Sequence, residues 1–323
     1  MKYTLIGSLK VSQICLGCMG FGDASQGMHS WTLPYEDSKK IIFHALESGI
    51  NFFDTAMAYQ SGTSEEYLGR AIKEYGHRED VIIATKYTPK SDDSIDSRTY
   101  LRECLNNSLR RLQTDYIDLY IMHMWDYRTP IEKTLEILND FIKEGKIKEI
   151  GISNCFAYQL AMANTIAKER GLQGFVSVQG HYNLIFREEE REMKRYCDQE
   201  GIAMTPYSAL ASGRLAKHPG ETSQRLEKDT YALGKYDASS DLDLKIIQRV
   251  EELASKHHVS MSEVSLSWLM SKVASPIVGA TKLKHVDTAV LATELELSEE
   301  EKQYLEEPYQ PHPLVGVMAT NTK

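Results

Sequence analysis

Four chemically different side chains stand at comparable places in the sequence, at or just after the end of a short apolar run. Asp54 lies in NFFDT, and Tyr59 follows it five positions later. Lys86 ends VIIATK, and His123 ends IDLYIMH. Each of these residues alone has an ordinary structural explanation. Ionisable groups at the ends of three successive apolar runs are less readily explained by chance, so the pattern indicates one site.

Together the four groups suit the protonation of an oxygen that is becoming an alkoxide. A phenol such as Tyr59 has a pKa near 10 and is a weak acid at neutral pH, but a neighbouring ammonium lowers that pKa. Asp54 would hold Lys86 in place and keep it charged, and His123 would hydrogen-bond the reacting oxygen. The reaction that fits is reduction of a carbonyl by hydride, which requires a nicotinamide cofactor.

The elements that must position these groups follow a regular rhythm of short apolar runs and longer segments of helical period. The runs are QICLG, NFFDT, VIIATK, IDLYIMH, IKEIGIS, GFVSVQ, IAMTPYS and SPIVGA. Before them, residues 3–12 predict a hairpin with its turn at Gly7-Ser8. Eight strand–helix units predict a single (β/α)8 TIM barrel over residues 1–323, with an N-terminal β-hairpin and a C-terminal helix and tail. Active sites of such barrels lie at the C-terminal ends of the strands.

Composition narrows the class of protein. Among 323 residues, 42% are hydrophobic and 26% are charged, which is typical of a soluble globular enzyme. The net charge of −9 weighs against a nucleic-acid partner. No apolar run approaches the roughly 18 residues of a membrane span, and no leader-like stretch begins the chain. We therefore expect a cytoplasmic protein that acts on a small molecule.

Other motifs that suggest different chemistry do not fit their context. Cys15 and Cys18 form C-x-x-C at the end of an apparent strand, whereas a redox pair belongs at a helix start, so a structural role is favoured. YEDSK at 35–39 matches the Y-x-x-x-K of short-chain dehydrogenases by letter but lies too near the N-terminus. GCMGFGDAS has the wrong spacing for a dinucleotide-binding loop. His and Asp do not cluster at the strand ends, so no metal site is expected.

In order and separation, FFDTAMAY, ATK and IMH resemble the Asp, Tyr, Lys and His motifs of the aldo-keto reductases. The resemblance covers essentially the whole chain. GCMGFG, WTLP, SLRRL, WDYRTPIEKTLE and HYNLIFREEEREM are similar to a bacterial branch close to the aryl-alcohol-dehydrogenase-like members. The resemblance implies that Tyr59 donates the proton, that Lys86 tied to Asp54 tunes Tyr59, and that His123 orients the carbonyl.

The resemblance also implies NADPH/NADP+ as cofactor. At the nicotinamide end, the groups that would hold the carboxamide are Ser153, Asn154 and Gln179, and the stacking aromatic is Tyr207. The cofactor face after the first strand of the barrel is implied to carry Cys18 and Met19.

Further along the cofactor, the implied pyrophosphate contacts are Ser208, Leu210, Ser212 and Arg214. The implied contacts of the adenosine 2′-phosphate are Thr281, Lys282 and His285. Many members of the family carry an acid and an asparagine where this chain has Thr288 and Ala289, although Asp287 could partly substitute. The charge of Lys282 favours NADPH over NADH.

Two functions of different classes remain open, with a metal-dependent barrel hydrolase as a distant third. The first is an NADPH-dependent carbonyl reductase, and the second is a barrel that senses NADPH for a protein partner. The segment 213–240 is expected to fold over bound dinucleotide. An apolar mouth suited to an aromatic aldehyde is predicted from Met19, Phe21, Trp31, Tyr87 and Trp125. Nothing in the sequence indicates the physiological substrate or the oligomeric state.

Overall fold

Eight parallel strands form the central sheet of the protein. The structure is a computed structural model that describes residues 1–218, 221, 235–236 and 240–321. The order of strands in the sheet is β10-β3-β4-β5-β6-β7-β8-β9. Their bounds are β3 Cys15–Gly17, β4 Phe52–Asp54, β5 Ile82–Tyr87, β6 Ile117–Met122, β7 Ile147–Ser153, β8 Ser177–Gln179, β9 Ala203–Met204 and β10 Ile277–Gly279. All eight predicted strands are therefore present.

The two ends of this sheet meet through backbone hydrogen bonds. Ile277 N–H donates to Pro206 O at 2.9 Å, and Ala274 N–H donates to Met204 O at 3.1 Å. These contacts join the segment of β9 to the segment of β10, so the sheet curls into the predicted barrel.

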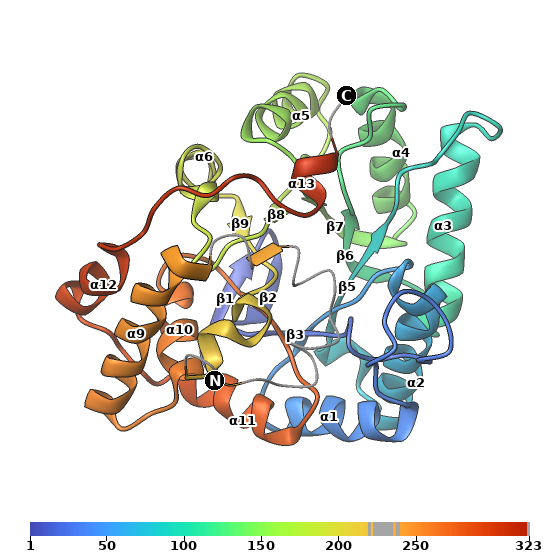
Figure 1. Ribbon diagram of the computed structural model, residues 1–323. Helices are drawn as coiled ribbons and strands as arrows, with labels where there is room; N and C mark the ends of the chain where they lie inside the picture. Colours follow the sequence, from blue (N-terminus) through green and yellow to red (C-terminus); the bar gives the residue numbers. More distant parts are fainter. Residues whose placement is uncertain (219–220, 222–234, 237–239, 322–323) are drawn as a thin grey trace.

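Helices surround the sheet, and Figure 1 looks along the barrel with the helices arranged as a ring. Their bounds are α1 Tyr35–Glu47, α2 Thr63–Tyr75, α3 Ser97–Leu112, α4 Ile131–Lys143, α5 Ala157–Glu169, α6 Met193–Glu200, α9 Ser240–His257, α10 Met261–Met270, α11 Leu283–Ala292, α12 Glu299–Glu306 and α13 Val317–Thr320. Several begin at the residues that the sequence marks as caps. The Asp96 carboxylate accepts from Arg98 N–H at the start of α3, and Ser260 with Glu263 forms a capping box at α10.

Alternating side chains divide the strands between two apolar layers. Phe52, Ala84 and Ile121 belong to a cluster inside the barrel, whereas Phe53 and Tyr120 belong to the larger cluster between strands and helices. Because side chains of a strand alternate with period two, the next inward positions after these are Asp54, Lys86 and His123. The lower part of the barrel lumen is thus apolar, and the upper part carries the ionisable groups.

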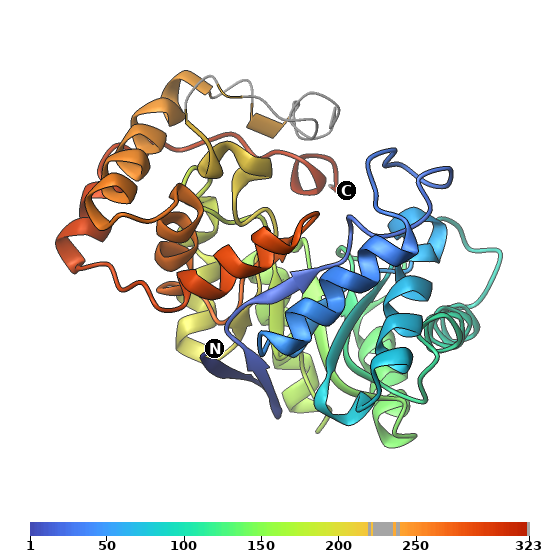
Figure 2. The same ribbon diagram turned by 90° about the horizontal axis from the view of Figure 1, so that it is seen from below.

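The predicted hairpin closes the lower end of the barrel. β1 (Tyr3–Ile6) pairs antiparallel with β2 (Leu9–Ser12), and Ile6, Leu9 and Val11 join the inner cluster. Glu149 of β7 accepts hydrogen bonds from Ser8 N–H and Ser8 Oγ, which ties the turn to the barrel wall. Figure 2 shows the dark-blue hairpin at one end of the molecule and the blue loop that follows β3 at the other.

Two predicted segments differ from expectation or lie partly outside the described residues. The acidic run Glu188–Glu190 is expected to open a helix, because negative charge is favourable at a helix N-terminus. It forms a separate 3-10 turn, η3, and does not open α6, which begins at Met193. The physical reason is that Glu188 Oε1 accepts from Tyr309 Oη and from His312 N–H, so it faces the C-terminal tail. Of the predicted flap 213–240, residues 219–220, 222–234 and 237–239 are outside the described part of the chain.

The C-terminal tail runs from α12 across the viewer's face of the barrel to α13 (Figure 1). His312 Nε2 lies 2.9 Å from Asp243 Oδ1 of α9, and both side chains are buried. At its far end Asn321 O accepts a hydrogen bond from Tyr127 Oη at 3.1 Å. In the part of the chain that is described, no helix has the length and apolar character needed to cross a bilayer.

The hairpin turn leads to a test of stability. Gly7 has φ +55°, and a Cβ there would lie 2.7 Å from Glu149 Oε1. Gly145 has φ +70° with nothing within 4 Å of the same position. Left-handed backbone costs alanine about 1–2 kcal/mol, and displaced hydrogen bonds to Glu149 add about 1 kcal/mol or more. We expect Gly7→Ala to lower the free energy of unfolding in urea more than Gly145→Ala. Equal losses would show that the turn does not depend on Glu149.

Candidate active site

The strand register brings the ends of β4 and β5 to the same height in the barrel. Asp54 pairs with Ala84, and Lys86 lies two residues further along β5 on the same inward face. Lys86 pairs with Ile121 of β6, two residues before His123. The residues that the sequence singled out therefore meet at the upper end of the lumen.

A buried ion pair forms the centre of the site. Lys86 Nζ lies 2.6 Å from Asp54 Oδ1, and the two side chains are 0% and 3% exposed. Lys86 Nζ also donates to Thr55 O at 2.8 Å and to Tyr59 Oη at 3.1 Å. An ammonium has three protons and no acceptor, so these three contacts use all of them. Burial lowers the pKa of Lys86, but Asp54 and Tyr59 outweigh burial and leave that pKa above its usual value.

Tyr59 receives a hydrogen bond from Lys86, which fixes the direction of its own proton. Because Lys86 Nζ can only donate, the phenol oxygen accepts and its O–H is left to point elsewhere. Burial raises the pKa of Tyr59 above its usual value of 10.0, and the opposing effect of Lys86 does not cancel that rise. The predicted influence of Lys86 is thus present but smaller than the effect of burial. Tyr59 holds its proton at neutral pH, as a proton donor must.

His123 lies beside Tyr59 as a neutral ring. The two ring centroids are 5.9 Å apart with an interplanar angle of 80°. Burial, with a smaller contribution from Lys86, lowers the pKa of His123 to about 3. Its Nδ1 is buried and has no hydrogen-bond partner among the described residues. A neutral imidazole at this place can donate one hydrogen bond to an oxygen in the mouth.

Gln179 has a role that the sequence did not reveal. Its Nε2 donates to Asp54 Oδ2 at 2.9 Å, so β8 holds the second oxygen of the carboxylate that pairs with Lys86. The Oε1 of Gln179 accepts no hydrogen bond from the described residues, and the same side chain can still meet a carboxamide. No spacing rule in the sequence indicates the contact with Asp54, because 125 residues separate the two.

Ser153, Asn154 and Tyr207 form a network next to this pair. Asn154 Nδ2 donates to His123 O at 2.9 Å and to Ser153 Oγ at 2.8 Å, while its Oδ1 accepts from Tyr207 Oη at 2.9 Å. Ser153 Oγ donates to Gln179 O at 2.9 Å. The four residues predicted for the nicotinamide end therefore lie together, beside Asp54 and His123.

The segment after β9 is a loop with repeated left-handed backbone. Positive φ values occur at Ser208 (58°), Ala211 (48°), Ser212 (57°) and Gly213 (104°). Ala211 N–H donates to Ser208 O, and Gly213 N–H donates to Leu210 O, which curls the loop tightly. The Arg214 guanidinium lies 4.8 Å from the Tyr236 ring. Loops of this kind turn successive N–H groups towards one concave side and are suited to anions.

The residues predicted for the adenosine end lie at the start of α11. Lys282 is the exposed N-cap residue of that helix, and Thr281 N–H donates to His285 Nδ1 at 3.2 Å. Asp287 lies 2.5 Å from His44 Nε2 of α1. The Asp287 carboxylate, expected to substitute partly for the missing acid, is therefore held against α1.

Some residues predicted at the mouth face the core. Tyr87 and Phe21 are 1% and 0% exposed and pack between strands and helices, so the prediction that they line the mouth is wrong. The physical reason for Tyr87 is strand alternation, because it follows the inward-facing Lys86. The Cys18 side chain is also buried in this layer, although its N–H donates to Asp54 O at 2.8 Å. The carbonyl oxygen of Cys18 accepts from Phe21 N–H at 2.9 Å and from Ser64 Oγ at 2.8 Å, so its backbone groups also have partners within the protein.

The remaining residues predicted for the mouth differ in exposure. Met19 and Trp31 are partly exposed. Trp125 is buried in the same cluster as Tyr87, and its backbone N–H donates to Asn154 O at 3.3 Å. Cys15, like Cys18, is buried and reduced, in agreement with the structural interpretation.

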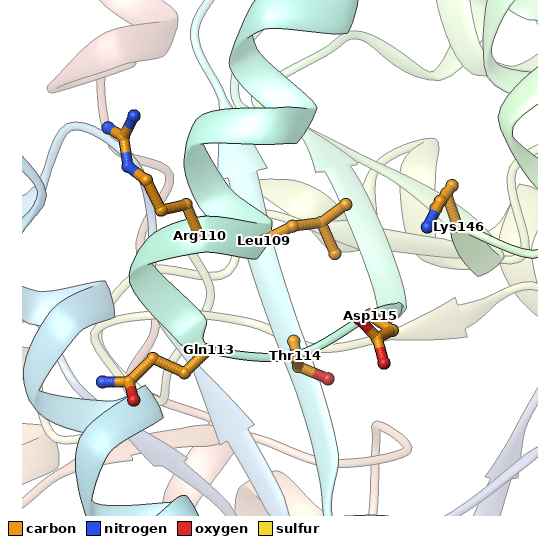
Figure 3. Close-up of a pocket in the computed structure, with 6 residues that line it drawn as sticks. All are labelled: Leu109, Arg110, Gln113, Thr114, Asp115 and Lys146. Atoms are coloured by element: carbon orange, nitrogen blue, oxygen red, sulfur yellow. The ribbon is translucent and has the colours of Figure 1, made fainter.

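A surface hollow elsewhere does not compete with this site. It has a volume of about 350 Å³ and lies at the opposite end of the barrel, where α3 ends and β6 and β7 begin. Figure 3 shows Arg110 and Gln113 on one side of the helix end and Asp115 and Lys146 on the other. Its charged groups do not converge, so it offers no catalytic arrangement.

Comparison with known sequences identifies the class of protein. Residues 13–310 match the profile of the aldo/keto reductase family, and the chain belongs to that family. It is 38% identical to an aldo-keto reductase of Fusarium vanettenii, over 95% of this chain and 90% of the relative. It is also 38% identical to the versiconal hemiacetal acetate reductase of Aspergillus parasiticus, over 96% of this chain and 98% of the relative.

The branch and the fold agree with this assignment. A putative aryl-alcohol dehydrogenase of Schizosaccharomyces pombe is 36% identical over 95% of each chain. The expected aryl-alcohol-dehydrogenase-like branch is confirmed, although these relatives are fungal and the motifs pointed to bacterial members. The glycerol dehydrogenase of Gluconobacter oxydans superposes with a TM-score of 0.79, 25% identity and 97% coverage of each chain. A thermostable aldo-keto reductase in complex with epalrestat superposes with a TM-score of 0.77 and 28% identity. The match covers 95% of this chain and 100% of that chain.

The neutral state of His123 can be measured directly. The pKa of His123, about 3, lies below the ordinary histidine value of 6.5. Between these two pH values the ring is neutral in the folded protein and protonated in the unfolded chain. The contribution of His123 to stability is present above pH 6.5 and is lost as pH falls towards 3. We expect its ring resonance in NMR not to titrate between pH 5 and 8. The same resonance in urea-unfolded protein is the control, and folded-state titration near pH 6.5 would contradict the assignment.

Proposed function

We propose that this chain is an NADPH-dependent aldo-keto reductase that reduces aldehydes or ketones to alcohols, with Tyr59 as the proton donor. The observation that carries the proposal is the triple donation of Lys86 to Asp54, Thr55 and Tyr59. It leaves the Tyr59 proton as the one acidic hydrogen directed away from the ion pair.

The residues present fit a nicotinamide dinucleotide at three separate places. Gln179 Oε1 has no partner among the described residues and lies in the network that includes Ser153 and Asn154. The left-handed loop from Ser208 to Gly213 is suited to a pyrophosphate. Lys282 stands at the N-terminus of α11, where a phosphate is favoured by charge and by the helix N–H groups.

In this proposal the substrate carbonyl oxygen lies between Tyr59 and His123. Hydride for the carbonyl carbon is the chemistry that NADPH supplies when bound. As negative charge develops on the oxygen, His123 donates a hydrogen bond to it and Tyr59 transfers its proton. The Lys86 ammonium then stabilises the phenolate that Tyr59 becomes. Asp54, held by Gln179, keeps the ammonium charged and fixed.

The proposed substrates are apolar aldehydes, with aromatic aldehydes as the first class to examine. Met19 and Trp31 are partly exposed near the strand ends, and Trp125 lies beside Asn154. A relative of 36% identity is named as a putative aryl-alcohol dehydrogenase, and one of 38% identity as a versiconal hemiacetal acetate reductase. NADPH consumption against aromatic, aliphatic and sugar-derived aldehydes tests the class.

Removal of the phenol hydroxyl tests the proton donor. General acid catalysis contributes about 10²–10⁴-fold, so Tyr59→Phe should lower kcat by that order while NADPH affinity stays nearly unchanged. The matched control is Tyr87→Phe, because the Tyr87 hydroxyl is buried and has no hydrogen-bond partner among the described residues. Near wild-type turnover in Tyr59→Phe would refute the mechanism. Tight NADPH binding without turnover in the wild type would instead favour the cofactor-sensing role.

Cofactor preference is tested at α11. A hydrogen bond to a charged group contributes about 1.5–3 kcal/mol, which corresponds to about tenfold or more in affinity. We expect NADPH to bind more tightly than NADH and Lys282→Ala to reduce that ratio by about tenfold. Lys73→Ala, an exposed lysine in the last turn of α2, is the control. Equal affinities of the wild type in fluorescence titration would exclude the role of Lys282.

A further inference from the structure

A closed loop of residues 22–32 follows β3 at the upper end of the barrel. Phe21 and Leu33 form an isolated parallel bridge, and Gly22 N–H donates to Leu33 O at 3.2 Å. Leu33 N–H donates to Gly20 O at 2.8 Å. The ends of the loop are therefore side by side, as in a compact Ω-loop. Such loops lack regular secondary structure and must satisfy their backbone groups in another way.

The side chain of Gln60 supplies those hydrogen bonds from outside the loop. It is 1% exposed. Its Oε1 accepts from His29 N–H at 3.0 Å. The two N–H groups on its Nε2 are shared among three carbonyl oxygens, those of Asp23 and His29, each at 3.0 Å, and that of Gln26. One amide group thus joins three separated positions of the loop.

Two glycines let the loop close around this side chain. Gly27 has φ +76°, and a Cβ there would lie 2.7 Å from Gln60 Cα. Gly22 has φ +137°, and a Cβ there would lie 2.8 Å from Gln60 Cβ. The fit between loop 22–32 and Gln60 is close enough that neither glycine can accept a larger residue without a shift.

Gln60 directly follows Tyr59 in the chain. Both belong to the turn η1, Tyr59–Gly62, in which Gln60 has φ 47° and ψ 48° and Ser61 has φ 56°. Non-glycine residues hold such backbone angles only where their surroundings enforce them, and this occurs often at functional sites. Gln60 O also accepts from Thr63 Oγ1 at 2.8 Å, which anchors the turn to the start of α2.

Loop 22–32 carries Trp31 to the segment that follows β3. A Cβ on Gly20 would lie 3.3 Å from Trp31 Cζ3, so the indole ring packs close to the backbone of Gly20. The ring centroids of Trp31 and His29 are 5.1 Å apart. His29 N–H donates to Gln60 Oε1, and His29 O accepts from Gln60 Nε2.

We propose that Gln60 is a positioning residue that holds loop 22–32, and with it Trp31, in a fixed relation to Tyr59. One residue then sets both the rim of the substrate mouth and the turn that bears the proton donor. The kinetic consequence rests on the proposed carbonyl reduction, whereas the structural consequence does not. Loss of the amide should release the rim, raise KM for a bulky aromatic aldehyde and change KM for a small aliphatic aldehyde much less.

Two variants of Gln60 distinguish the effect of side-chain length from the effect of the hydrogen-bonding groups. Gln60→Asn keeps an amide and tolerates the left-handed backbone well, but it is one methylene shorter. Gln60→Glu keeps the length, and its neutral carboxyl can donate one hydrogen bond, whereas its ionised form faces three carbonyl oxygens. Burial raises the pKa of such a carboxyl above about 4.3, so this variant should lose the loop contacts as pH rises. Gln26→Leu is the control, because the exposed Gln26 side chain hydrogen-bonds only Asp23 Oδ2 among the described residues.

Hydrogen exchange of the peptide 22–33, measured by mass spectrometry without ligand, tests the structural part. We expect at least tenfold faster exchange in Gln60→Asn, no change in Gln26→Leu and unchanged exchange in β5 and β6. In Gln60→Glu, exchange relative to wild type at each pH should increase as pH rises. Wild-type exchange of this peptide in Gln60→Asn would overturn the proposal.

Kinetics tests the coupling to the mouth. We expect Gln60→Asn to raise KM for an aromatic aldehyde about tenfold, with kcat changed less than about threefold, and KM of Gln60→Glu to acquire a pH dependence that the wild type lacks. Faster loop exchange with unchanged KM would overturn the coupling and leave the reductase proposal intact. If the wild type reduces no aldehyde, the function proposal fails, and the exchange measurement still decides whether Gln60 holds the loop.

Discussion

The ammonium of Lys86 is the constraint on which the upper half of the barrel depends. A buried charge is strongly unfavourable unless it is paired and its hydrogen bonds are satisfied. Here Asp54, Thr55 and Tyr59 take all three donors, and Gln179 holds the remaining oxygen of Asp54. These partners come from β4, from the loop after it and from β8. The strands must therefore keep their register, because a shift by one residue would turn Asp54 or Lys86 out of the lumen.

Burial of the upper lumen sets the protonation of the two rings beside this ion pair. Burial raises the pKa of Tyr59 and lowers that of His123, so both rings are neutral at physiological pH. A neutral phenol and a neutral imidazole are each able to donate a hydrogen bond to one oxygen. The site thus places two neutral donors above a single compensated charge. This arrangement suits a reaction in which negative charge appears on the substrate oxygen and is removed within the same site.

The sequence was sufficient for the rhythm of eight strand–helix units and for the inward positions of Asp54, Lys86 and His123, because both follow from short-range periodicity. It was insufficient where a side chain meets a partner far along the chain. The contact of Gln179 with Asp54 and the insertion of Gln60 into loop 22–32 depend on how separate strands and loops are placed in space. Tyr87 was placed at the mouth although alternation after Lys86 directs it to the core. Glu188 accepts a hydrogen bond from Tyr309 of the C-terminal tail, more than 120 residues away, and so does not start α6.

The hairpin at the base of the barrel has a consequence for how the chain acquires its structure. β1 and β2 precede the barrel strands in the chain, yet the turn between them binds Glu149, and Ser12 O accepts from Ser275 Oγ across 263 residues. The inner cluster that the hairpin covers also needs Ile277 of the last strand. The hairpin must therefore wait until residues 275–277 are made before its apolar face is covered. Contacts of such long sequence separation slow folding and prolong the exposure of the hairpin edge, which makes the nascent chain dependent on protection from aggregation.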